Sequence, residues 1–339
     1  MTLEPGQSVA IVAIGRNEGA RLKSCLRSVC DGVRTVVYVD SGSDDGSADY
    51  AREMGCHVVE LDPHRPFSAA RARNEGFAAL MRVDPDVPFI QFLDGDCDLV
   101  GTWLNEGIEA LNERPEIGVA CGHVREIYPD ASLYNKLCNM EWQKTPGIIR
   151  TSGGRFLIRR EVFSAVGGFR ADVIAAEDDE FCVRVRRLGW KILQVDAEMA
   201  LHDADLSHLT EWWRRARRTG HAYAHVASLH GKSDEQYFVR DCRRILLWAL
   251  ILPIMAAILA PFTYGWSIIF LLLSYALEAI RIYHRGRTRG WPAIDSFQYA
   301  VFAVLAKFPA LEGFIAYHWR QYRGQALTVM EYRRSSSGT

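Results

Sequence analysis

The chain has 339 residues, 49% of them hydrophobic and 24% charged, so it has enough apolar material for a large buried core and is not a disordered protein. Its 40 basic and 41 acidic residues give a formal net charge of -1, which excludes the global positive field of a nucleic-acid-binding protein. Nucleic acid is therefore not expected as a partner.

Short apolar segments alternate with amphipathic segments over the first two thirds of the chain. Strands are predicted at Val9–Ile14, Thr35–Asp40, His57–Leu61, Phe89–Leu93 and Gly118–Val124. Helices are predicted at Gly19–Val29, Ser47–Met54 and Ala69–Met81. This alternation is typical of βαβ units, so we expect an α/β fold with a mainly parallel sheet flanked by helices.

Polar residues follow three of the predicted strands. The clusters are Gly15–Glu18, Ser41–Gly46 and Gly95–Asp98. Because ligands of open α/β sheets bind beyond the carboxyl ends of the strands, these clusters predict a single ligand site. Asp94 immediately precedes the last cluster and Asp96 lies within it, and together they offer two carboxylates to a hard divalent cation. Alternatively, both aspartates only solvate a turn.

The composition changes after about residue 235, and no charged residue occurs from 245 to 277. One helix of that length would be roughly 50 Å long, whereas the hydrocarbon core of a bilayer is about 30 Å thick. We therefore predict a helical hairpin over residues 245–283 that turns at Pro261–Gly265. The alternative is a buried helical pair in a soluble domain.

Basic residues flank the hairpin on both sides, which places both ends in the cytoplasm under the positive-inside rule. They are Arg240, Arg243 and Arg244 before it, and Arg281, Arg285, Arg287 and Arg289 after it. A third apolar stretch, residues 297–318, contains Lys307, Pro309 and Glu312, which favours an interfacial helix over a full span. The expected organisation is a domain over 1–235, a membrane-associated helical region over 236–325 and a tail over 326–339.

The eight cysteines include no CxxC pair and no metal-ligand spacing. We interpret them as reduced core thiols in a cytosolic compartment. The first seven residues carry neither a basic patch nor a long apolar stretch, so the N-terminal domain is not expected to be exported.

Several segments resemble, in chain order, the landmarks of family 2 glycosyltransferases, which are inverting enzymes with a GT-A fold that use nucleotide-sugar donors. The segments are 9–18, 39–47, 72–76, 94–96, 153–163, 166–170 and 177–184. The resemblance covers roughly residues 7–225 and implies a GT-A, Rossmann-like sheet. The chain departs from the family pattern at Arg16, where an aromatic residue is usual, and it lacks the QxxRW element of processive synthases near Trp212.

The resemblance also implies which residues bind the donor. They are Ile14, Arg16, Glu18, Asp40, Arg73, Asp94 and Gly95. Asp40 can accept hydrogen bonds from a base N–H or a ribose hydroxyl, and the Arg73 guanidinium can bind carbonyl or phosphate oxygens. Alternatively, Asp40 and its neighbours Asp44 and Asp45 cap the turn and the following helix. For Arg71, a role in the site and simple exposure to solvent both stay open.

For a Mg²⁺ or Mn²⁺ ion, the resemblance implies Asp96 as a ligand and His202 as an additional one. A structural role is the alternative for His202. In the family, the aspartate of the Glu-Asp pair is the catalytic base, so Asp178 is expected to take the acceptor proton while Glu177 positions it. The alternative is that these acids only cap a helix. Arg184 is expected to pair with the acidic cluster one turn away.

The predicted function is metal-dependent, inverting sugar transfer from a nucleotide sugar, first of all a UDP-sugar, to a lipid-linked or saccharide acceptor. The expected location is the inner, cytoplasmic membrane with the catalytic domain in the cytoplasm, in polysaccharide and cell-envelope biosynthesis. Two alternatives stay open: a polyprenyl-phosphate sugar transferase, and a catalytically silent nucleotide-sugar-binding scaffold. The segment Trp212–Arg218 suits either an anionic ligand or a membrane surface.

Overall fold

The computed structural model describes residues 5–325, which form two compact units that divide between Ser207 and His208. The expected boundary at 235 lies farther along the chain. It differs because helix α8 (Leu209–His230) packs along α13 (Lys307–Tyr322) and so belongs to the C-terminal unit. The expected tail over 326–339 lies outside the described residues.

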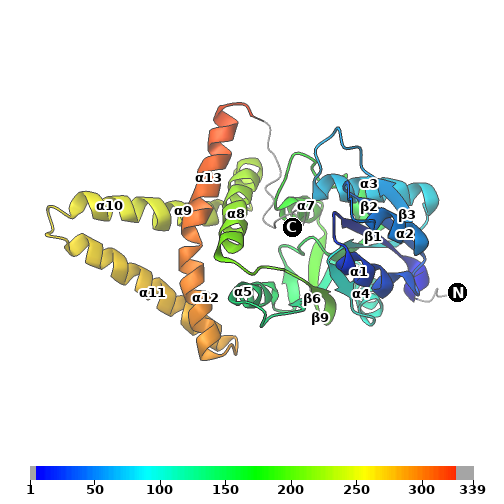
Figure 1. Cartoon of the computed structure of the whole chain (residues 1–339), viewed down its shortest axis with the longest axis horizontal. Coiled ribbons are helices and arrows are strands. Elements are labelled where there is room, and N and C mark those ends of the chain that lie inside the picture. Colours follow the sequence, from blue (N-terminus) through cyan, green and yellow to red (C-terminus); the bar gives the residue numbers. More distant parts are fainter. Residues whose placement is uncertain (1–4, 326–339) are drawn as a thin grey trace. The chain divides into compact units, whose positions relative to one another are not determined.

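The N-terminal unit is built around a mixed sheet (Figure 1). Its first half is parallel, with the order β3 (His57–Glu60), β2 (Thr35–Asp40), β1 (Val9–Gly15), β4 (Phe89–Asp94). All five predicted strands are present, within a residue or two at each end. The expected parallel strands of an α/β sheet are therefore present in this half.

The second half of the sheet contains antiparallel pairs that the sequence pattern did not predict. The order continues β8 (Phe156–Arg159), β6 (Ile117–Glu126), β9 (Lys191–His202), β5 (Cys97–Leu99), and β7 (Gly147–Ile149) pairs with β9. β8 is antiparallel to both β4 and β6, whereas β6 and β9 are parallel. Only the first half of the sheet is thus wholly parallel.

Helices flank this sheet, and the three predicted helices are among them. They are α1 (Ala20–Cys30), α2 (Ser47–Glu53), α3 (Ala69–Val83), α4 (Trp103–Glu113), α5 (Leu133–Trp142), α6 (Arg160–Val166) and α7 (Glu177–Arg187), after a short 3₁₀ turn at Pro5–Ser8. Gly76 allows α3 to approach β1, because a Cβ at this position would lie 2.4 Å from a Val12 methyl carbon.

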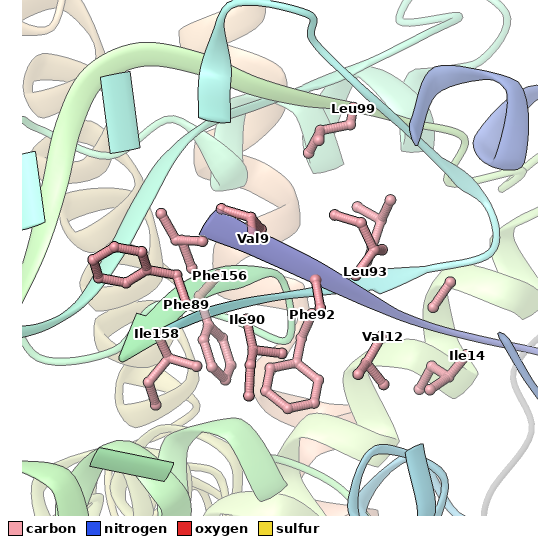
Figure 2. Packing of buried hydrophobic residues seen from close by; sticks show 14 of the residues in the cluster. Val9, Val12, Ile14, Phe89, Ile90, Phe92, Leu93, Leu99, Phe156 and Ile158 are labelled. Atoms are coloured by element: carbon pink, nitrogen blue, oxygen red, sulfur yellow. The ribbon is translucent and has the colours of Figure 1, made fainter. Parts of the chain in front are cut away.

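The core lies between the sheet and these helices (Figure 2). Every residue from Val9 to Ile14 is buried, as expected for the centre of an α/β sheet. Phe92 of β4 contacts Phe156 of β8, with ring centroids 5.4 Å apart, and Phe163 of α6, at 5.0 Å. This apolar block fixes the strand ends that carry the polar clusters.

The C-terminal unit is helical. Residues Val239–Leu259 form one continuous helical segment, made of α9 (Val239–Leu246), a π-helical turn (Leu247–Ile251) and α10 (Leu252–Leu259). It forms a hairpin with α11 (Trp266–Thr288), and α12 (Ala293–Leu305) leads into α13 (Figure 1). The turn lies between Leu259 and Trp266, the segment that contains Pro261 and Gly265.

Three helical segments of this unit are long and apolar enough to cross a membrane: Val239–Leu259, Trp266–Thr288 and Ala293–Tyr322, with mean hydropathy 2.0, 1.5 and 1.5. The hairpin arms have 21 and 23 residues and are therefore about 32 and 35 Å long. They extend beyond the charge-free run because the flanking arginines are also helical. In the arm Trp266–Thr288, none of the most apolar window is buried.

Candidate active site

The loops after β1, β2 and β4 converge at one edge of the sheet. Residue pairs of adjacent strands are Gly15 with Asp40 and Ile14 with Asp94. The Gly95 N–H donates to the Ile14 carbonyl (2.8 Å), and a Cβ at Gly95 would lie 3.2 Å from that oxygen. The structure thus brings Ile14, Asp40, Asp94 and Gly95 together at the predicted strand ends, and glycine is favoured because β1 lies so close.

Asp40 is buried and is held by its own turn. Its Oδ2 accepts from the N–H groups of Gly42 (2.9 Å) and Ser43 (2.8 Å), and its Oδ1 accepts from the Tyr38 hydroxyl (3.1 Å). The capping interpretation therefore describes these contacts, and nucleoside binding by Asp40 stays a prediction. Asp45 likewise accepts from the Ser47 N–H (3.0 Å) at the start of α2.

Arg16 and Glu18 lie in the loop after β1. The Arg16 guanidinium carbon is 5.4 Å from the centroid of the Phe67 ring, and Glu18 pairs with Arg21 at 2.9 Å. Donor binding by Arg16 and Glu18 stays a prediction. Arg71 is buried rather than exposed to solvent. Its guanidinium donates to backbone carbonyls of the preceding loop, including that of Arg65 (2.8 Å).

Arg73 connects the two acidic motifs. Its Nη2 donates to Asp94 Oδ1 and its Nη1 to Glu177 Oε1, both at 2.8 Å, and its side chain is only 3% exposed. Burial alone would lower the pKa of Arg73, but the carboxylates of Asp94 and Glu177 raise it above its ordinary value. Arg73 therefore remains a cation between the predicted donor site and the predicted base.

Neighbouring residues of the same motifs hold Arg73 in position. A Cβ at Gly154 would lie 2.4 Å from Arg73 Nη2, so only glycine leaves room for the guanidinium. Asn74 exchanges two 2.8 Å hydrogen bonds with the backbone of Phe169, and a Cβ at Gly168 would lie 2.6 Å from Asn74 Oδ1. The Arg-Asn dipeptide on α3 thus anchors the glycine-rich segments to the site.

Asp178 follows Glu177 in the first turn of α7 and is half-buried. Within residues 5–325 no hydrogen bond or ion pair to its carboxylate is found. Burial, then the like charges of Asp179 and Glu177, raise the pKa of Asp178 to about 7, although Arg73 and Lys144 oppose this shift. A carboxylate with such a pKa and no bound donor has the properties of a general base.

Glu180 and Arg184 confirm the predicted pairing one turn along α7. Arg184 Nη2 lies 2.7 Å from Glu180 Oε2, and Glu180 is fully buried. Within the part of the chain that the structure describes, Glu177 and Glu180 are thus paired with arginines, whereas Asp178 between them is not.

Asp96 and His202 lie together, with His202 Nε2 3.2 Å from Asp96 Oδ2. Both are buried, and the β5–β9 register places Cys97 opposite His202. Ligand atoms of Asp96, Cys97 and His202 lie within 4.8 Å of one another. A carboxylate and an imidazole suit Mn²⁺ or Mg²⁺, whereas a thiol is the softer ligand that these ions do not select. The residues present thus fit the expected ion.

Two further residues of this cluster were not predicted. Arg155 of the loop before β8 lies 3.3 Å from Asp94 Oδ2 and 3.1 Å from His202 Nδ1. Trp142, at the end of α5, stacks on the His202 ring with centroids 4.5 Å apart. Arg155 stood inside a family segment, but nothing in the sequence marks a contact with Asp94. Trp142 lies on α5, a helix that the sequence pattern did not predict.

Comparisons with known proteins agree with this geometry. The profile described as Glycosyl transferase family 2 matches residues 8–175. Glycosyltransferase AglE of Haloferax volcanii is 23% identical over 211 residues, which cover 58% of this chain and 67% of AglE. The mannosyltransferase PcManGT of Pyrobaculum calidifontis, solved in complex with GDP-Man and Mn²⁺, has a TM-score of 0.57 at 20% identity, over 89% of this chain and 86% of that one.

The fold, the clustered motifs and these matches define the protein as a glycosyltransferase with a GT-A fold. Through the domain at residues 8–175, the chain belongs to glycosyltransferase family 2. Both the resemblance and the enzyme class that the sequence predicted are thereby confirmed.

Proposed function

We propose that this glycosyltransferase moves one sugar, with inversion and with a divalent cation, from a nucleotide sugar to a lipid-linked or saccharide acceptor at the cytoplasmic face of a membrane. The observation that carries the proposal is the bridge of Arg73 between Asp94 and Glu177. This bridge joins two motifs into one site. One is the Asp94 motif beside the expected cation, and the other is the Glu177 motif that contains Asp178.

Asp178 is the base in this proposal. Its carboxylate takes the proton of the acceptor hydroxyl as that oxygen forms a bond to the anomeric carbon, while the bond to the diphosphate breaks on the opposite face. Glu177 holds α7 in position through Arg73. A single displacement of this kind inverts the anomeric centre.

Asp96 and His202 would hold the cation. When bound, a divalent cation neutralises charge on the diphosphate that leaves. Asp40 and Asp94, which end β2 and β4 on either side of β1, would bind the nucleoside. The neighbour PcManGT was solved with GDP-Man and Mn²⁺, which supports a nucleotide-sugar donor and makes GDP-sugars a test case beside the expected UDP-sugars.

The acceptor would enter beside Lys144. This residue lines a cavity of about 460 Å³ in the N-terminal unit, together with Arg125, Asn139 and Gln143. Its positive charge also acts on Asp178, and its Nζ donates to the Thr151 carbonyl (2.9 Å). Amide and basic side chains near the base suit hydroxyl-rich acceptors that carry a negative group.

The hairpin of the C-terminal unit supports membrane association. Its arms are long enough to cross a bilayer, and large apolar side chains are exposed along it, among them Ile258, Phe262 and Phe270. A soluble protein rarely exposes so large an apolar surface without covering it. Arginines at both ends of the hairpin favour a cytoplasmic position for the two ends under the positive-inside rule.

The experiment is a donor panel on the full-length protein in detergent. UDP-, GDP- and dTDP-sugars are incubated with Mn²⁺ and with lipid-linked or saccharide acceptors, and release of the nucleoside diphosphate is measured. One donor class should turn over, and proton NMR of the product should show the inverted anomer. Asp178→Asn should lose turnover, whereas Asp49→Asn, an exposed aspartate of α2, should not. A retained anomer, or full turnover by Asp178→Asn, would refute the mechanism.

A further inference from the structure

Two cysteines of the N-terminal unit have their sulfur atoms in contact outside the site described above. Cys30 ends α1, and Cys56 immediately precedes β3. Their Sγ atoms are 3.7 Å apart although the residues are 26 positions apart in the chain. Neither residue carries part of the proposed chemistry, so this contact calls for a separate explanation.

One member of the pair, Cys30, is also partly exposed to solvent. Cys30 is half-buried, whereas the other seven cysteines, including Cys56 at 9% exposure, are buried, so Cys30 is the sulfur that a solvent oxidant reaches first. The contact favours one thiolate, because the hydrogen bond with Cys56 lowers the pKa of Cys30 and raises that of Cys56. A thiolate reacts with an external oxidant to form an adduct, and a second thiol in contact with it can resolve that adduct to an internal disulfide.

We propose that Cys30 and Cys56 are a reversible redox pair, which closes to an intramolecular disulfide in the presence of an external low-molecular-weight disulfide. The Cys30 thiolate attacks one sulfur of the external disulfide, whose S–S bond breaks and releases a thiolate. The Cys56 thiol then gives its proton to solvent and attacks the Cys30 sulfur, which releases the second thiolate. The two protein thiols lose two electrons, and the external disulfide gains them.

Closure requires only a small movement. The two sulfur atoms are 3.7 Å apart, and a disulfide bond is about 2.0 Å long. The sulfurs therefore have to approach by about 1.7 Å. The new bond joins the two ends of a segment that contains β2, the Asp40 turn and α2. It therefore restrains the segment that carries Asp40 and is expected to stabilise the N-terminal unit.

The test uses the full-length protein in mixtures of reduced and oxidised glutathione. Free thiols are alkylated, and peptides are mapped by mass spectrometry. The expected result is a Cys30–Cys56 linkage that forms first, is reversed by dithiothreitol and raises the unfolding temperature by several degrees. Wild-type protein alone decides the outcome. A stable glutathione adduct on Cys30, or oxidation only at other cysteines, would overturn the proposal.

Variants separate this pair from general thiol oxidation. Cys56→Ser should stop at the glutathione adduct of Cys30, and Cys30→Ser should leave Cys56 reduced. Cys242→Ser, in the C-terminal unit, should form the linkage as wild type does. If Cys30→Ser folds poorly, Cys30→Ala provides the same readout. A linkage that includes any other cysteine in these variants would contradict the pairing.

Discussion

Arg73 and Glu177 are 104 positions apart in the chain, yet Arg73 Nη1 and Glu177 Oε1 are 2.8 Å apart in a buried pair. The other terminal nitrogen of Arg73 binds Asp94. One guanidinium thus compensates the buried carboxylate of Glu177 and shares the partly exposed carboxylate of Asp94 with Arg155. It also fixes the distance between the two acidic motifs.

Removal of this bridge should affect both stability and turnover. Arg73→Met leaves the buried Glu177 carboxylate without its arginine partner and should lower the free energy of unfolding by about 3–5 kcal/mol, measured by denaturant titration. Arg73→Lys keeps a charge but not both hydrogen bonds, so kcat/KM should fall about 10- to 100-fold. Arg82→Lys, exposed on the same helix, is the matched control and should behave as wild type. Wild-type kcat/KM in Arg73→Lys would show that the bridge has no role in the reaction.

The pH dependence of turnover should report Asp178. A base acts when it is deprotonated, and the pKa of Asp178 is raised to about 7, so kcat/KM should rise with pH through an inflection near 7 and then level off. Initial rates across a pH series with a fixed donor measure this. An acidic limb near the ordinary aspartate pKa would mean that another group is the base.

The neighbours of Asp178 predict opposite shifts of that limb. Asp179→Asn removes a like charge that raises the pKa of Asp178, so the inflection should move to lower pH. Lys144→Met removes a positive charge that lowers it, so the inflection should move to higher pH. Shifts in the same direction for both variants would exclude a Coulombic origin.

The parallel half of the fold was predictable because local pattern determines it. Alternating apolar runs gave β1, β2 and β4, and the polar residues at their ends gave Asp40 and Asp94. The antiparallel half depends on pairing between distant segments. β5 has three residues, and only its register with β9 brings Cys97 opposite His202. No local periodicity reports such a contact.

The same reason explains which site contacts were missed. The Arg73, Asp94 and Glu177 motifs were each visible, but the direct bridge among them was not, because it joins α3, β4 and α7. Arg155 and Trp142 approach His202 from a loop and from an unpredicted helix. The sequence thus identified residues with predicted chemical roles. The ion pairs between them could be found only in the folded structure.

The expected metal ligands, Asp96 and His202, and the nearby Arg155 predict opposite effects of two substitutions on Mn²⁺ binding. Asp96→Asn should weaken it at least about 10-fold, because a carboxylate ligand is lost. Arg155→Met should strengthen it several-fold, because a cation 3.3 Å from Asp94 and 3.1 Å from His202 is removed. Electron paramagnetic resonance titration of free Mn²⁺, with nucleoside diphosphate present, measures both.

Asp98 is the control for the metal experiment. Its Oδ2 accepts from the Ser24 hydroxyl at 2.7 Å, and along β5 it alternates with Cys97, so Asp98→Asn should leave Mn²⁺ affinity unchanged. If Asp96→Asn bound Mn²⁺ as tightly as wild type while Asp98→Asn did not, the ligand assignment would be wrong.

The contact between α8 and α13 should be sensitive to single methyl groups. A Cβ at Gly220 would lie 1.9 Å from the Ala310 carbonyl oxygen, and one at Gly313 would lie 1.9 Å from that of Arg217. Gly220→Ala or Gly313→Ala should therefore separate the helices and lower the unfolding temperature in detergent by several degrees. Gly101→Ala, whose Cβ would meet nothing within 4 Å, is the control. An unchanged unfolding temperature in both helix variants would contradict this close packing.

Membrane association should depend on the apolar surface of the hairpin. Leu273→Lys and Leu277→Lys together place two charges on exposed positions of α11, where each costs about 2.5–3.5 kcal/mol at the centre of a bilayer. The double variant should shift from the floating fraction to the pellet or soluble fraction when vesicles of phosphatidylethanolamine and phosphatidylglycerol are centrifuged through sucrose. Leu209→Lys, at an exposed leucine that begins α8, should float as wild type does. Because the charges lie in the C-terminal unit, hydrolysis of a soluble donor should continue in the double variant. Flotation unchanged by the two lysines would mean that α11 does not enter the bilayer.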